Sequence, residues 1–142
     1  KSLNKDVQIF HGINYEEAKI AWARSKYTLS FTMNSINTVR EPKGRVAEDP
    51  NFAVLFTEDF PGLDKYYNRD EMVVFKDVED CINKMNYYDN NPEELEKIFL
   101  KGKKALWERN TVYHEWNKIL PQIDKDYKKV DPNKIIKDNH NE

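Results

Sequence analysis

Short apolar runs alternate with helix-forming stretches along this chain, and this alternation limits how it can fold more than any other feature. Four runs rich in β-branched and aromatic residues predict strands over 7–11, 27–33, 53–56 and 72–75. Strands that alternate with helices form parallel sheets joined by right-handed crossovers. The sequence therefore predicts an α/β fold with a parallel sheet of about four strands and flanking helices.

The helix boundaries can be read from capping signals. Asn14 and Glu17 have the spacing of a capping box, and Asn91 followed by Pro92 is typical of a helix start. A last helix is predicted over 112–127, with a kink at the proline inside it. No strand is predicted after 75, so the C-terminal third is helical and the sheet stays small.

The charge balance excludes some classes of partner. The 142 residues carry 23 basic and 25 acidic side chains, so no long-range positive field favours nucleic acid, and no nucleic-acid partner is expected. Cys81 is the single cysteine, which excludes an intrachain disulfide and a cysteine-built metal site. No apolar run approaches the ~20 residues of a membrane span, and a cytoplasmic location is expected.

The loop over 34–45 is the first candidate binding site. In an open parallel sheet, ligands bind where loops leave the carboxyl ends of the strands, and this loop follows the second predicted strand. Gly44 allows close backbone approach at the start of a short helix near 44–49, and Lys43 and Arg45 add positive charge for a phosphate. Glu48 can accept two hydrogen bonds from a ribose diol. A solvated charged turn is the alternative interpretation.

Other side chains leave fewer options. His11 ends the first predicted strand, where it faces either a ligand or solvent. Tyr66 and Tyr67 are either core residues or a platform for a sugar. No histidine pair has metal-ligand spacing, and no serine-nucleophile motif, dinucleotide-binding loop or phosphate-binding P-loop is present. Cys81 lies on the apolar face of a helix, which favours a buried thiol.

Five segments in order carry a family resemblance. They resemble the C-terminal, donor-binding domain of GT-B fold glycosyltransferases of the group-1-like family, and they cover nearly the whole chain apart from its tail: "VQIFHGINYEEAKIAWARSKYTLSF", "KGRVAE", "AVLFTEDFPGLDKYY", "EMVVFKDVEDCINKMNYY" and "NPEELEKIFLKGKKALWERNTVYHEWNKIL". The resemblance implies a Rossmann-like donor-binding domain, here a fragment over 1–128. The residues of the tail over 129–142 predict weak order.

The resemblance also implies roles for individual residues. Lys43 and Arg45 would face the donor diphosphate, and Glu48 would hold the donor ribose. Glu41 would correspond to a glutamate that faces the transferred sugar. The run before Asn34 is also similar to the donor region of α-1,3-fucosyltransferases, so a UDP- or GDP-linked sugar is the donor that the resemblance implies. The nucleotide-sugar is a substrate, and neither a cofactor nor a metal is expected.

The sequence departs from the family pattern directly after Glu48. The family continues with small residues and a glycine, whereas this chain reads "DPNF", so a shorter or differently ended helix is expected. We expect the chain to be part of a longer protein and nearly inactive alone, because the acceptor glycan or protein binds a preceding N-terminal domain that this chain lacks. Two alternatives remain: a non-catalytic interaction module of the same fold, and an unrelated nucleotide-binding regulatory domain.

Overall fold

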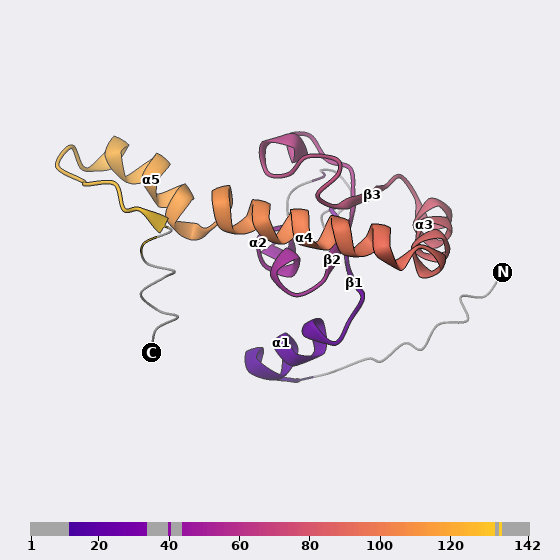
Figure 1. Ribbon diagram of the computed structural model, residues 1–142. Helices are drawn as coiled ribbons and strands as arrows, with labels where there is room; N and C mark the ends of the chain where they lie inside the picture. The colour runs from indigo at the N-terminus through magenta and orange to yellow at the C-terminus, as the bar shows by residue number, and fades with distance from the viewer. Residues whose placement is uncertain (1–11, 34–39, 41–43, 133, 135–142) are drawn as a thin grey trace.

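A small parallel sheet forms the centre of the molecule (Figure 1). The computed structural model describes residues 12–33, 40, 44–132 and 134. Within them, β1 (Tyr27–Ser30), β2 (Val54–Glu58) and β3 (Val73–Phe75) form a three-stranded sheet in the order β1-β2-β3, with both pairs parallel. This confirms the predicted Rossmann-like α/β fold. The first predicted strand, over 7–11, lies outside the described residues.

The capping signals predicted the positions of the helices well. The other described elements are α1 (Tyr15–Ala23), α2 (Gly44–Glu48), η1 (Asp49–Asn51), η2 (Leu63–Lys65), α3 (Val78–Asn90), α4 (Pro92–Arg109) and α5 (Val112–Ile123). The Asn14 side chain accepts from the Glu17 amide at 2.9 Å, and the Glu17 carboxylate accepts from the Asn14 amide at 3.0 Å, as the capping box requires. Only α5 ends clearly earlier than predicted, at Ile123.

Two apolar clusters cover the two faces of the sheet. The first, on the side of α3, is the α3-side core and contains Val54, Phe56, Val73, Phe75, Cys81, Met85 and Leu95. The second, on the side of α2, is the α2-side core and contains Val46, Leu55, Phe60, Leu63, Tyr67, Met72 and Ala105. Successive residues of β2 enter opposite cores, which explains why that strand is apolar nearly throughout.

The long helix α4 crosses the molecule and reaches both cores (Figure 1). At Gly102 its backbone lies against the carbonyl oxygen of Glu71, so closely that a β-carbon would overlap that oxygen. At its last residue, Arg109 forms an ion pair with the mostly buried carboxylate of Glu71. The helix is therefore attached to the segment before β3 at two levels.

Helix α5 extends beyond the sheet at the far end of α4 (Figure 1). The chain after it folds back, and the Asn117 side chain donates to the Val130 carbonyl at 2.6 Å and accepts from the Val130 amide at 2.9 Å. The adjoining face of α5 leaves four apolar side chains exposed: Val112, Trp116, Ile119 and Ile123. No described helix has the length and apolar character to cross a membrane.

Candidate functional site

Glu58 organises the carboxyl edge of the sheet. It is the last residue of β2, and its side chain is 15% exposed. Its Oε2 atom accepts from the Thr32 amide at 2.9 Å and from the Thr32 hydroxyl at 3.2 Å, and it pairs with Arg40 Nη1 at 3.0 Å. Arg40 Nη1 also donates to the Thr32 hydroxyl at 3.4 Å. One carboxylate oxygen therefore ties the chain after β1 to the end of β2.

The electrostatics of this cluster keep Glu58 ionised. Burial by itself would raise the pKa of Glu58, but the hydrogen bonds from the Thr32 amide and from Arg40, together with the Arg40 charge, hold that pKa below its usual range. The other carboxylate oxygen, Oε1, accepts no hydrogen bond from the described part of the chain. An ionised carboxylate, whose Oε1 is not occupied by any described residue, is therefore fixed at the strand end.

An aromatic pair lies beside this carboxylate. Ser30 pairs with Thr57 and Glu58 pairs with Phe75, so Phe31, the next residue after β1, is level with Glu58 along the edge. The Phe31 ring contacts the Phe75 ring edge-to-face, with a centroid distance of 5.8 Å. Phe75 is fully buried, whereas Phe31 is 52% exposed. The edge thus offers both a charge and an apolar ring surface.

Helix α2 lies on the opposite face of the sheet from this aromatic pair. Its Val46 is buried in the α2-side core with Phe60 and Leu63, which follow the carboxyl end of β2. Gly44 at its start is exposed, and a β-carbon there would meet nothing within 4 Å. Glu48 at its end is also exposed. The short helix predicted near 44–49 is therefore present, and both residues are accessible on it.

The remaining predicted site residues are not located. Lys43, Glu41, Asn34 and His11 lie outside the described residues. For Arg45 the structure gives the backbone position within α2. Their assignment to a binding site therefore remains a prediction.

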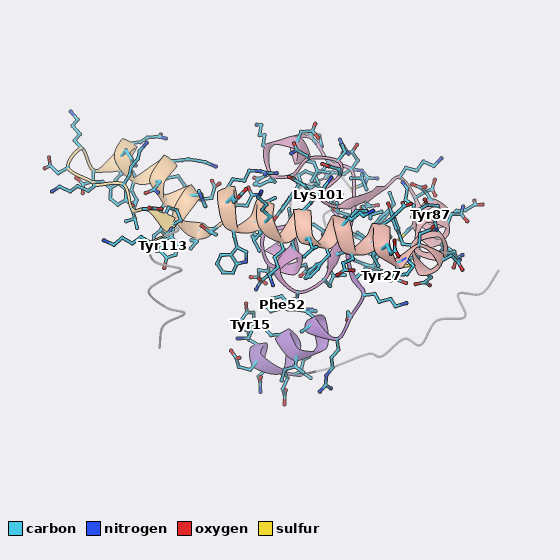
Figure 2. All side chains as sticks on the ribbon, viewed as in Figure 1. Tyr15, Tyr27, Phe52, Tyr87, Lys101 and Tyr113 are labelled. Atoms are coloured by element: carbon cyan, nitrogen blue, oxygen red, sulfur yellow. The ribbon has the colours of Figure 1, made fainter. Side chains whose placement is uncertain are left out.

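The segment that departs from the family pattern has a structural role. Asp49–Asn51 form the turn η1, and the Asp49 carbonyl accepts from the amides of Phe52 and Ala53 at 2.9 and 3.0 Å. The Asn51 side chain accepts from the Trp107 indole of α4 at 3.1 Å, and the Phe52 ring contacts Trp22 of α1 (Figure 2). The sequence after Glu48 therefore shortens the helix, as expected, and joins α1 and α4 to the sheet.

The other side chains that the sequence left open have structural roles. Tyr67 is buried in the α2-side core, and Tyr66 packs against that core, so the core interpretation holds for both. Cys81 is a buried free thiol. His114 bonds the Thr111 hydroxyl through Nδ1 at 2.8 Å and caps α5. Across the residues that the structure describes, no group of three potential ligands could hold a metal ion.

Sequence reasoning missed the residues that define the edge, namely Thr32, Arg40 and Glu58. The signal for Glu58 was available, because a carboxylate directly after the apolar run "AVLFT" stands at the ligand-binding end of a parallel strand. Arg40 carried no such signal, since it reaches Glu58 from a loop whose course depends on tertiary structure. Phe31 was included in a predicted strand and not considered as a surface residue.

Comparison with known proteins agrees with this architecture. The model of a family described as glycosyl transferase-like matches residues 4–121. No curated protein and no solved structure matches the chain. The matched region includes the three described strands, the Glu58 cluster and the described helices up to most of α5. The chain therefore belongs to the glycosyl transferase-like family, as a group-1-like domain.

Proposed function

We propose that this chain binds a nucleotide-sugar at the carboxyl edge of its sheet, as the donor-binding part of an enzyme that transfers the sugar to an acceptor hydroxyl. The observation that carries the proposal is the Glu58 cluster at the carboxyl edge of the sheet, the edge at which open parallel sheets bind ligands. The exposed Gly44 and Glu48 lie on α2, the helix that follows β1 along the chain. The family supports glycosyl transfer in general. The choice of a UDP- or GDP-linked donor is ours.

The residues have distinct proposed roles. The backbone at Gly44, with the positive charges of Lys43 and Arg45, holds the diphosphate, and Glu48 accepts from the ribose hydroxyls. During transfer, the acceptor oxygen bonds to the anomeric carbon, and the bond from that carbon to the phosphate oxygen breaks. The nucleoside diphosphate leaves with the bonding electrons, and the acceptor hydroxyl releases its proton. Cations at the diphosphate stabilise the negative charge that develops on it.

The acceptor, a glycan or a protein, is held in this proposal by a separate N-terminal domain. Much of the rate of such a transfer comes from holding the acceptor oxygen against the anomeric carbon. The chain alone should therefore bind the donor but transfer sugar poorly. Adding the acceptor-binding domain should restore transfer.

Calorimetric titration of the chain with UDP- and GDP-sugars tests the donor site. We expect one donor class to bind. Glu48→Gln should lower the affinity for that donor roughly 10-fold, because a charged acceptor for the ribose diol is lost. Arg45→Ala should lower the affinity for the nucleoside diphosphate and the affinity for the nucleotide-sugar by the same factor. The matched control is Glu96→Gln, an exposed carboxylate of α4 beside the first residue of β2, at the opposite edge.

Failure of every donor to bind would overturn the proposal. Binding that is unchanged in both Arg45→Ala and Glu48→Gln would move the site elsewhere. The second candidate function, a non-catalytic interaction module of the same fold, is favoured by one observation. The "DPNF" segment joins α1 and α4, whereas the resemblance implies a run of small residues at this position. Absence of donor binding by the folded chain would support that module.

A further inference from the structure

The Phe31 ring is exposed yet held in position. It projects from the chain directly after β1, on the face covered by α3, where Tyr27 and Leu29 of the same strand also pack. Its contact with Phe75 has an interplanar angle of 71°, the edge-to-face arrangement that aromatic rings prefer. Because Phe75 is buried in the α3-side core, this contact restrains Phe31 while about half of its surface remains open. A ring fixed in this way loses little freedom when a ligand stacks on it.

A carboxylate oxygen accompanies the ring. Glu58 is level with Phe31 at the edge, and its Oε2 atom is occupied by Thr32 and Arg40. Its Oε1 atom accepts nothing from the described residues, so it can take a hydrogen bond from a ligand hydroxyl. An apolar ring surface next to an ionised acceptor suits a sugar, whose C–H face is apolar and whose rim carries hydroxyl donors.

Helix α2 and Phe31 lie on opposite faces of the sheet. Val46 places α2, and with it Gly44 and Glu48, on the α2-side face, whereas Phe31 belongs to the α3-side face. A nucleotide-sugar bound as in the proposed function, with its ribose at Glu48 and its diphosphate at Gly44, would have to cross the strand ends to reach Phe31. The group attached beyond the diphosphate is the sugar.

We propose that Phe31 and Glu58 form the subsite for the transferred sugar, with Phe31 stacking on its C–H face and Glu58 Oε1 accepting from one of its hydroxyls. This subsite rests on the proposed function, because it needs a nucleotide-sugar at the same edge. Phe31 and Glu58 would then select the sugar without contributing to binding of the nucleotide. Their contribution is separable by comparing each nucleotide-sugar with its nucleoside diphosphate.

The test is calorimetric titration with UDP-glucose, UDP, GDP-fucose and GDP. For the donor class that binds, Phe31→Leu should lower the affinity for the nucleotide-sugar by roughly 3–10-fold, which is the range expected for one aromatic stacking contact. The affinity for the matching nucleoside diphosphate should be unchanged. Phe31→Tyr, which keeps the ring, should retain wild-type affinity. Tyr15→Leu is the matched control, because Tyr15 is 54% exposed on α1 and is not part of the edge.

The outcomes separate the two proposals. Equal nucleotide-sugar affinity in wild type and Phe31→Leu would overturn the sugar subsite and leave the donor site standing. If Phe31→Leu lowered the affinity for the diphosphate and for the nucleotide-sugar equally, the nucleoside would be the group that contacts Phe31. That result would also overturn the subsite. If wild type binds none of the four ligands, the donor site itself fails, and the subsite with it.

Discussion

Gly102→Ala is expected to destabilise the fold by about 1–3 kcal/mol, the usual cost of forcing an extra methyl group into a packed interior. The alanine β-carbon would overlap the Glu71 carbonyl oxygen and would lie 3.6 Å from the carbonyl carbon and 3.9 Å from Pro50 Cβ. Relief would require α4 to move away from the backbone before β3, because the obstacle is main chain. Urea unfolding followed by circular dichroism measures the loss, and thermal unfolding should shift by roughly 5–10 °C.

Gly44→Ala is the matched control for this substitution. A β-carbon at Gly44 meets nothing within 4 Å, and the residue begins a helix, where alanine is favoured over glycine. We therefore expect its stability to be unchanged or slightly higher. If Gly102→Ala were as stable as wild type, α4 would not approach Glu71 as closely as described.

Glu58→Gln should cost about 1.5–3 kcal/mol at neutral pH, because the hydrogen bonds from Thr32 and Arg40 are made to a charged group. The pKa of Glu58 lies below its unfolded value of 4.5, so the ionised contacts contribute fully above about pH 4.5. As pH falls through the lowered pKa, the carboxylate gains a proton and that contribution is lost. The difference in unfolding free energy between wild type and Glu58→Gln should therefore be constant near neutral pH and shrink below about pH 4.5.

Asp70→Asn separates this effect from general acid sensitivity. The pKa of Asp70 is also lowered, chiefly by its hydrogen bond from Lys101 at 2.6 Å, but both side chains are more than half exposed. Exposed pairs contribute little to stability, so the unfolding free energy of this variant should follow wild type at every pH. A wild-type and Glu58→Gln difference that persists at low pH would show that the charge of Glu58 is not what stabilises the edge.

Much of the fold was predictable because its signals are local. The N-cap at Asn14 and the Asn91–Pro92 start of α4 depend on neighbouring backbone groups, and both predicted helices were found. The apolar β2 needed only its composition. Strand ends were less accurate: the strand predicted over 27–33 stops at Ser30, because Thr32 turns its amide to the Glu58 side chain instead of continuing the ladder.

The site was only partly predictable for the opposite reason. Gly44 and Glu48 belong to one short segment, and their proximity follows from sequence alone. The Arg40–Glu58 pair joins residues 18 apart in number across a loop, and the Phe31–Phe75 contact joins two strands separated by a third. Such contacts depend on sheet order and register, which no local pattern in this chain determines. The edge therefore became visible only once the strands were paired.

Helix α4 has a further consequence for how the molecule comes apart. Leu95 near its start belongs to the α3-side core and Ala105 near its end belongs to the α2-side core, so this single helix contributes residues to both cores. Neither core can lose its packing without disturbing the other, because α4 and β2 contribute to both. The described body should consequently open in a single cooperative step, with the amides of β2 protected until both cores are lost together.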